Sequence, residues 1–212
     1  TSATNLTTAT VAITGNFGGA QDALSFTASG GLTGSYDAAK GILTITGDAP
    51  AATWQAALRT VTYQNTAGGG ASTATRTITF SLGSGLLNAT TGHFYEYVSV
   101  SPGTVTWAQA KAAAAARTYF GLAGYLATIT TASENAFVAA KVAADGWIGA
   151  QTAGATFPRT WSWQSGPESG TSICSNTSAG VCSPIAGAYS NWNGGEPNNA
   201  GLETVCEFYF SG

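Results

Sequence analysis

Alternation of apolar and polar residues most restricts what the N-terminal part of this chain can fold into. β-Branched or aromatic residues alternate with polar ones in four stretches, at 10–14, 24–27, 41–46 and 76–82. Because successive side chains of a strand point to opposite faces, this period of two predicts half-buried strands. Clusters of Gly, Asn and Asp between the stretches predict turns. Short strands at regular intervals are typical of an all-β sandwich.

One short helix is expected within this sandwich, from Ala51 to Arg59. Thr53 is its candidate N-cap, because a hydroxyl accepts a hydrogen bond from the first turn of a helix. The inward-facing residues at helical spacing are Trp54, Ala57 and Leu58.

The C-terminal part of the chain mixes helices with strands. A helix at 107–119 is expected after the N-cap Thr106, and a second helix opens on a capping box at Thr131 and Glu134. Strands are expected at 93–98, 124–129, 146–150 and 161–163. Gly83-Ser84-Gly85 marks the boundary. The predicted domains are therefore a β-sandwich at 1–85 and an α+β domain at 86–212.

Charged residues are scarce, which excludes several classes of partner. They make up 8% of the 212 residues, the formal net charge is −3, and Lys plus Arg total 7. A basic patch for nucleic acid is therefore not expected. No apolar run approaches the roughly 20 residues of a membrane span, so membrane insertion is not expected. A neutral polar surface favours a secreted or cell-surface location. The first residue is Thr1 rather than Met, which predicts a piece of a longer protein.

Three cysteines fit a secreted protein. Cys174 and Cys182 bracket a short polar segment and predict a disulfide that closes this loop. Cys206 is left over, and it has either a partner beyond the end of this sequence or a role as a buried thiol. The spacing does not fit a zinc site.

A loop with several oxygen donors follows near the end of the chain, at 190–199 (S-N-W-N-G-G-E-P-N-N). Its Glu196 carboxylate and the amides of Asn198 and Asn199 are hard oxygen donors that suit Ca²⁺. Pro197 restricts the backbone between the donors. Glu203 follows as a third candidate ligand. The predicted cofactor is therefore Ca²⁺.

The N-terminal part resembles the cadherin-like or immunoglobulin-like repeats of large bacterial surface adhesins of the RTX type. The order G-I-L-T-I-T-G, W-Q-A-A-L-R-T-V-T-Y-Q-N-T and T-R-T-I-T-F-S-L carries this resemblance. It implies an extender module beside neighbouring modules of the same long chain. Such repeats often bind Ca²⁺ at their junctions, but Asp22, Asp37 and Asp48 are scattered here and are interpreted as turn residues.

The C-terminal part, from about His93 to Gly212, resembles the C-type lectin-like domain. The order of strand, helix, Y-L-A-T-I, helix, W-I-G, W-x-W and G-E-P-N-N carries the resemblance. It implies an α+β fold with two helices, two small sheets and a long irregular region at 152–190. The E-P-N motif implies binding of mannose-, glucose- or fucose-type sugars, whose vicinal hydroxyls share Ca²⁺ with the protein ligands.

By this resemblance, Glu196, Asn198 and Glu203 are metal ligands, and a cis Pro197 separates two of them. These three residues with Asn199 also contact the carbohydrate, and Tyr189 is a candidate aromatic that faces the sugar. The sequence ends where the W-N-D motif of the family is expected, and residues 150–153 lack the carboxylate of an auxiliary Ca²⁺ site. Alone, the three ligands fall short of the about six to eight oxygens that Ca²⁺ prefers.

Two functions follow from these patterns. The first is a Ca²⁺-dependent module of a secreted adhesin that binds a cell-surface glycan or polysaccharide. The alternative is a structural or protein-binding surface module without a sugar site. An enzyme is not expected, because the sequence lacks a G-x-S-x-G motif and a phosphate-binding loop. Four tryptophans of the lectin-like part are expected to be core residues rather than sugar platforms: Trp147, Trp161, Trp163 and Trp192.

Overall fold

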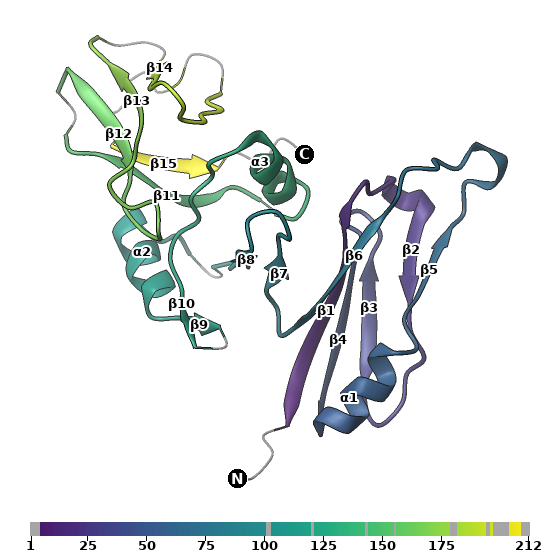
Figure 1. Ribbon diagram of the computed structural model, residues 1–212. Coiled ribbons are helices and arrows are strands. Elements are labelled where there is room, and N and C mark those ends of the chain that lie inside the picture. The colour runs from purple at the N-terminus through teal and green to yellow at the C-terminus, as the bar shows by residue number, and fades with distance from the viewer. Residues whose placement is uncertain are drawn as a thin grey trace. The chain divides into compact units, whose positions relative to one another are not determined.

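The computed structural model describes residues 5–100, 103–119, 121–142, 144–154, 156–178, 182–193, 196 and 204–208 (Figure 1). These residues are mainly β, with three short α-helices. The chain divides into two compact units, Thr1–Glu96 and Tyr97–Gly212. The β-rich character expected from the sequence is confirmed at this level. None of the helices in the described ranges is long and apolar enough to span a membrane.

A four-stranded antiparallel sheet forms the larger layer of the first unit, in the order β3-β4-β1-β6. A two-stranded sheet of β2 and β5 forms the second layer. The strands are β1 (Leu6–Gly15), β2 (Asp22–Ser25), β3 (Thr33–Asp37), β4 (Ile42–Ala49), β5 (Thr62–Asn65) and β6 (Thr77–Leu82). Four of them cover the stretches whose alternation predicted strands, and their inward residues build one core around Val11, Ile13, Leu43 and Ile45.

Helix α1 (Ala51–Leu58) lies beside this core, close to the bounds expected from the sequence (Figure 1). Trp54 and Ala57 are buried as predicted, and the Trp54 indole N–H donates to the carbonyl of Leu6 at 2.9 Å. The predicted N-cap was wrong: the cap residue is Pro50, whose extended backbone precedes the helix, and Thr53 lies inside its first turn.

A short hairpin of β7 (Leu86–Leu87) and β8 (Phe94–Tyr95) belongs to the first unit. The Ser84 hydroxyl donates to the Glu96 carboxylate at 2.6 Å, which ties the start of the hairpin to its end. The division between units therefore falls after Glu96, whereas the sequence predicted it after Gly85. The glycines there lead into a hairpin rather than into the second unit.

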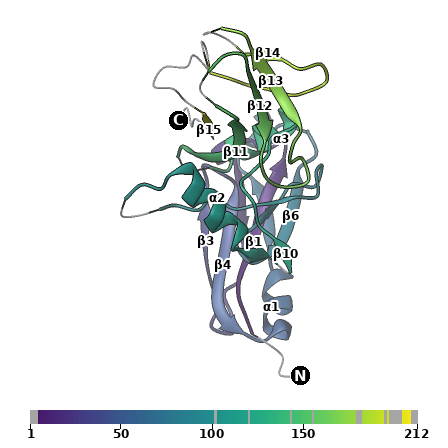
Figure 2. The ribbon, with the colours of Figure 1, turned by 90° about the vertical axis from the view of Figure 1, so that its left-hand side faces the viewer.

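The second unit contains a five-stranded antiparallel sheet in the order β14-β13-β12-β11-β15 (Figure 2). Its strands are β11 (Gly146–Thr152), β12 (Arg159–Trp163), β13 (Ser172–Asn176), β14 (Ser183–Pro184) and β15 (Val205–Phe208). The region at 152–190 was expected to be irregular, but three of these strands lie in it. The other elements are α2 (Trp107–Ala115), α3 (Ala132–Ala139), β9 (Thr118–Tyr119) and β10 (Leu122–Ala123).

Both helices of the second unit begin at their predicted caps. The Thr106 hydroxyl accepts from the Gln109 N–H, and the Gln109 side chain accepts from the Thr106 N–H, which is a complete capping box. Thr131 caps α3 by accepting from the Glu134 N–H at 3.1 Å, but the predicted capping box is incomplete, because the Glu134 carboxylate accepts from the Thr130 N–H at 2.6 Å. Helix α2 ends at Ala115, earlier than predicted, because β9 follows. The strand expected at 124–129 is not formed: these described residues have no regular secondary structure, and the Ala127 carbonyl accepts from the Gly149 N–H of β11 at 2.8 Å.

Candidate functional site

Trp192 and Thr204, which lie on either side of the predicted Ca²⁺ ligands in sequence, contact one pair of residues in the five-stranded sheet. Before the predicted ligands, the Trp192 ring packs on the Trp161 ring at 5.5 Å between centroids, with the planes tilted by 59°. After the loop, the carbonyl of Thr204 accepts from the Thr152 N–H at 3.0 Å. Thr152 and Trp161 are direct cross-strand partners between β11 and β12. Trp192 and Thr204, which come before and after the predicted ligands in sequence, therefore both contact this one pair of sheet residues.

Glu196 is the predicted ligand that the structure describes. It is half-buried, and its N–H donates to the carbonyl of Asn193 at 2.9 Å, which closes a turn at the start of the loop. The other predicted ligands, Asn198, Asn199 and Glu203, lie outside the described residues, as does Pro197. No group of three or more His, Cys, Asp or Glu that could hold a metal was found in the described part of the chain. The predicted ligand set therefore remains a prediction.

Tyr189 lies shortly before this loop and is half-buried. Burial raises the pKa of its phenol, so the side chain stays neutral and can donate a hydrogen bond at physiological pH. Its predicted contact with a sugar stays a prediction.

A buried cation stands beside the sheet position that anchors the loop. Arg159 is 2% exposed, and its guanidinium lies over the rings of Phe157 and Trp161 at 4.6 Å and 5.4 Å. Sequence reasoning missed Arg159. The alternation R-T-W-S-W contained the signal, because it places Arg159 on the same strand face as Trp161 and Trp163.

Several buried polar atoms near this anchor have no hydrogen-bond partner among the residues described. They are the indole N–H groups of Trp161 and Trp192 and the side-chain amide of Asn176, which is the cross-strand partner of Arg159. Buried polar atoms of native proteins are usually satisfied by protein, water or ligand. The base of the loop thus offers mainly hydrogen-bond donors, which suit the oxygens of a polar ligand or of bound water.

The predicted disulfide joins Cys174 and Cys182, whose Cα atoms are 5.7 Å apart. Cys174 lies on β13 and pairs across the strands with Trp161. The disulfide therefore braces the strand next to the loop anchor. Cys206 lies in β15 as a buried thiol.

The predicted core tryptophans divide into two groups. Trp161 and Trp163 are buried as expected, at 1% and 5% exposure. Trp147 and Trp192 are only half-buried, so the prediction overstated their burial. Trp147 is nevertheless fixed, because its indole N–H donates to the carbonyl of Val105 at 2.8 Å.

The three aspartates of the first unit have different roles from one another. Asp37 is a turn residue as predicted, because its carboxylate accepts from the N–H groups of Ala39 and Lys40 at 3.0 Å and 3.2 Å. Asp48 instead lies within β4 and is exposed. Asp22 was also wrongly interpreted as a turn residue, since it is fully buried at the start of β2.

The Asp22 carboxylate accepts hydrogen bonds from four residues, one of them a buried cation. The Arg76 Nε lies 2.8 Å from Oδ2, and the Gly18 N–H donates to the same oxygen at 2.6 Å. Tyr63 and Asn65 donate to Oδ1 at 2.8 Å and 2.7 Å. Burial alone would raise the pKa of Asp22, but these donors outweigh it and hold the pKa far below its ordinary value. With only donors around it, the carboxylate is a structural anion.

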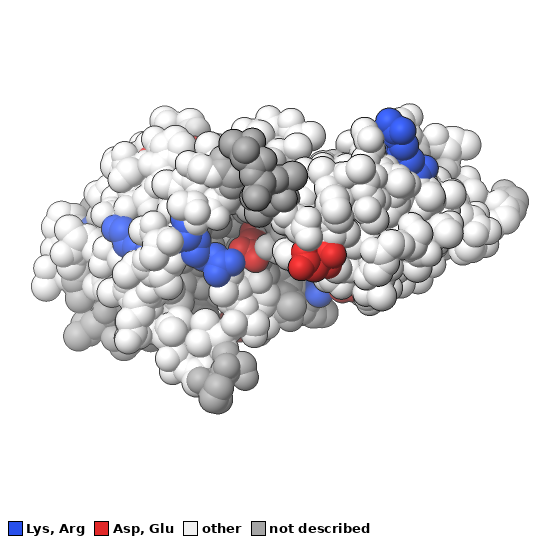
Figure 3. All heavy atoms as spheres, turned by 90° about the horizontal axis from the view of Figure 1, so that it is seen from below, with Lys and Arg blue, Asp and Glu red and all other residues white. Residues whose placement is uncertain are grey.

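Charged groups are also sparse at the surface. On the face drawn in Figure 3, Lys, Arg, Asp and Glu side chains are few and mostly isolated. This agrees with the 8% charged residues of the sequence.

Comparison with known proteins gives one relative. No family model matches the chain, and no solved structure matches it. The chain is 36% identical over 208 residues to Halomucin from Haloquadratum walsbyi, and the match covers 92% of this chain. It covers 2% of Halomucin, so the chain spans only a small part of the length of this relative.

Proposed function

We propose that the second unit binds carbohydrate in a Ca²⁺-dependent manner through the loop at 190–203. The observation that carries the proposal is that Trp192 and Thr204, on either side of the predicted ligands, both contact the Thr152–Trp161 pair. Because the residues on both sides of the predicted donors contact one sheet position, we expect the donors between them to be confined to one small region. Confinement before binding lowers the entropy that ligand binding must overcome.

The chemistry of the donors suits this role. Glu196 and Glu203 supply carboxylate oxygens, and Asn198 and Asn199 supply amide oxygens, all of which are hard ligands for Ca²⁺. Vicinal hydroxyls of a mannose-, glucose- or fucose-type sugar would complete the oxygen shell together with water. The carboxylates would also accept hydrogen bonds from the sugar hydroxyl groups, while the amide N–H groups donate hydrogen bonds to the hydroxyl oxygens.

The proposed setting is a large secreted or cell-surface protein, with neighbouring modules in the same chain. Similarity to a segment of Halomucin supports a surface-associated or extracellular location. The Cys174–Cys182 disulfide supports it as well, because disulfides persist in oxidising compartments. In this setting the first unit would be an adhesin-type extender, and the second would be the carbohydrate-binding element with a lectin-like fold.

Removal of Ca²⁺ or of the Glu196 carboxylate is expected to abolish sugar binding. We expect the chain to bind mannose- or fucose-type glycans on an array with Ca²⁺ and to lose that signal in EDTA. Glu196→Gln should reduce binding at least about tenfold, because it removes a charged ligand. Asp48→Asn is the matched control, since it removes an exposed carboxylate from the other unit. Equal glycan signals with Ca²⁺ and with EDTA would contradict the proposal.

Exchanging the carboxylate and the amide within the E-P-N motif is expected to change which sugar binds. In the Glu196→Gln, Asn198→Asp double variant the carboxylate and the amide exchange positions, which reverses the order of acceptors and donors along the loop. We expect preference to move from mannose-type to galactose-type sugars, measured as the ratio of the two array signals. A double variant that keeps the original ratio would show that these side chains do not contact the sugar.

A structural role is the second candidate function. The match to a short part of a very long relative favours it, since long surface proteins contain many modules that only extend or connect. A chain that binds neither Ca²⁺ nor any glycan would leave this candidate as the better account.

A further inference from the structure

Three N-x-[ST] sequons, the acceptor motif for Asn-linked glycans, begin at Asn5, Asn88 and Asn176. The motif alone does not decide where a glycan is attached. A glycan is bulky and hydrated, so its asparagine must lie at the surface of the folded protein. The structure describes all three asparagines and separates them by their exposure and by their contacts.

Asn5 is the one of the three asparagines that is exposed. It lies directly before β1, and Thr7 of the same sequon is exposed as well, whereas Leu6 between them is half-buried. Because successive residues of extended chain point to opposite sides, this alternation places the Asn5 amide and the Thr7 hydroxyl together on the outer side. These are the two groups that the motif requires.

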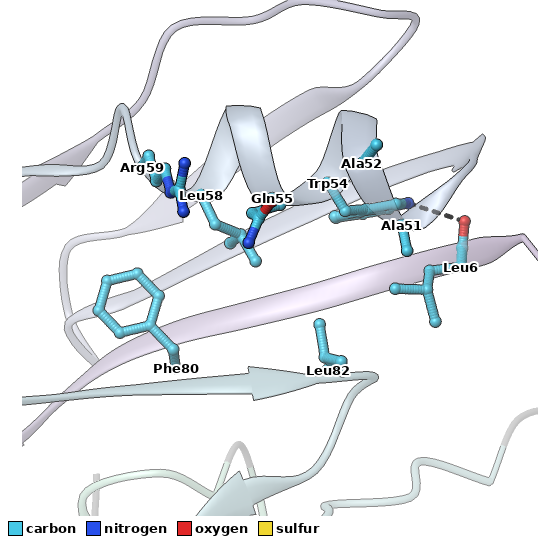
Figure 4. A pocket seen from close by; sticks show the side chains of 9 residues that line it. All are labelled: Leu6, Ala51, Ala52, Trp54, Gln55, Leu58, Arg59, Phe80 and Leu82. Carbon is cyan, nitrogen blue, oxygen red and sulfur yellow. Dashed lines mark hydrogen bonds between the residues drawn. The ribbon is translucent and has the colours of Figure 1, made fainter.

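Leu6 fixes this orientation. It packs against the core of the first unit and lines an apolar groove beside α1, and its carbonyl accepts from the Trp54 indole N–H (Figure 4). Strand β1 pairs with β4 at Leu6, but its pairing with β6 extends only to Ala9. In the described part of the chain, the sequon at Asn5 therefore has a neighbouring strand on one side only, which leaves room for a transferase to approach.

Asn88 is fixed in the loop between β7 and β8. It is 5% exposed, and its side-chain carbonyl accepts from the Thr90 N–H at 3.0 Å. Its own backbone N–H donates to the carbonyl of His93 at 2.9 Å. A glycan on the amide would require the side chain to leave this buried position and to lose its hydrogen bond with Thr90. The folded first unit is therefore not compatible with a glycan at Asn88.

Asn176 is buried in the five-stranded sheet. It is 5% exposed and is the cross-strand partner of Arg159, which is 2% exposed. A glycan on its amide would have to pass through this packed face and separate the side chains around it. Asn176 is therefore an interior residue, although Thr177 and Ser178 of its sequon are exposed.

We propose that Asn5 carries an Asn-linked glycan and that Asn88 and Asn176 do not. In the transfer, the Asn5 Nδ2 forms a bond to the anomeric carbon of a glycan supplied on a lipid phosphate carrier. The bond between that carbon and the phosphate oxygen breaks, the amide loses one proton, and the carrier phosphate leaves with the bonding electrons.

The setting of the chain supports such a transfer. The Cys174–Cys182 disulfide and the similarity to a segment of Halomucin both indicate an exported protein, which can meet a lipid-linked glycan on its way to the surface. Asn5 belongs to the first unit, and occupancy by a glycan is read from peptide masses. The proposal therefore stands or fails independently of the sugar binding proposed for the second unit.

Digestion with trypsin, which cleaves after Lys and Arg, places each sequon in a separate fragment. The fragments end at Lys40 for Asn5 and span 77–111 for Asn88 and 160–212 for Asn176. We expect mass spectrometry of the protein from its own cells to find a glycan on the first fragment only, and enzymatic release of that glycan to convert Asn5 to Asp. An unmodified first fragment, or a glycan on either of the other two, would overturn the proposal.

Variants at exposed positions test the assignment without disturbing the fold, in the chain secreted from a eukaryotic cell that attaches glycans at this motif. Asn5→Gln and Thr7→Ala should each abolish the glycosylated form, whereas Thr7→Ser should retain it, because serine keeps the hydroxyl. Thr90→Ala and Ser178→Ala are the matched controls, since they remove the other two sequons at exposed positions and should leave the glycan in place. A chain secreted without a glycan, or a glycan that is lost in either control, would contradict the assignment to Asn5.

Discussion

Asp22→Asn is expected to lower the free energy of unfolding of the first unit by about 3–5 kcal/mol. It removes the negative partner of a buried ion pair and leaves the positive partner buried without a counter-charge. Asp22 is fully buried, and its partner Arg76 has a side chain that is 6% exposed. Asparagine has the same shape, but it replaces one acceptor oxygen by a donor. One or more of the surrounding donors then lose their partner, and the guanidinium loses its counter-charge.

The ion pair of Asp37 with Lys40 provides the matched control. The two groups lie 3.2 Å apart, and their side chains are 42% and 28% exposed. Asp37→Asn should therefore cost at most about 1 kcal/mol, as exposed ion pairs do. Urea unfolding followed by hydrogen exchange in β1 and β4 measures both variants in the first unit alone. Equal losses for the two variants would show that the buried network contributes no more than a surface pair.

The same network predicts how the stability of the first unit depends on pH. The pKa of Asp22 is held below its ordinary value in the folded state, so the folded state favours the ionised carboxylate. Its contribution is complete above the unfolded pKa of about 3.9 and is lost as the pH falls from there toward the lower folded pKa. Unfolding curves between about pH 7 and 2 should therefore show an acid-dependent loss of stability that is smaller in Asp22→Asn.

The Asp22 network also shows why a single sequence predicts strands better than their connections. β1 and β4 were predictable, because the alternation of apolar and polar residues along each strand indicates which face is buried. The partners of Asp22 are 41, 43 and 54 residues away, at Tyr63, Asn65 and Arg76. Nothing local to Asp22 indicates that three distant donors converge on it, so a turn was the natural interpretation.

Strand β3 was missed for a related reason. Its sequence T-G-S-Y-D lacks apolar alternation, and it contains a glycine. It is a strand because its backbone pairs with β4 over five positions, from Thr33–Thr46 to Asp37–Ile42. Hydrogen bonds between distant segments override the weak local preference there.

The candidate site, too, could be predicted from the sequence only in part. The E-P-N-N motif and Glu203 could be found from the sequence, because the donor types and their spacing are local. The anchor at Thr152 and Trp161 could not, because it depends on the register of β11 against β12 and on a contact with Trp192. The motif thus predicts the chemistry of the proposed site, and the sheet fixes the residues on either side of it, Trp192 and Thr204.

Trp161→Ala is therefore expected to affect both the stability of the second unit and its binding of sugar. Trp161 is 1% exposed, and it contacts the guanidinium of Arg159 and the ring of Trp192. Truncation of a buried tryptophan leaves a cavity and costs about 3–5 kcal/mol. It also removes the surface on which the loop begins, so the donors of the loop lose their fixed starting point.

Trp163 separates these two effects, because it is a buried residue on the same face of β12. Trp163→Ala should cost about as much stability as Trp161→Ala. Phenylalanine variants of both positions keep more of the packing, and they can be compared as folded proteins well below their unfolding temperatures. Trp161→Phe should weaken Ca²⁺-dependent glycan binding, since the smaller ring shifts Trp192, whereas Trp163→Phe should bind like the unchanged chain. Equal binding by the two phenylalanine variants would show that the Trp161–Trp192 contact does not position the loop.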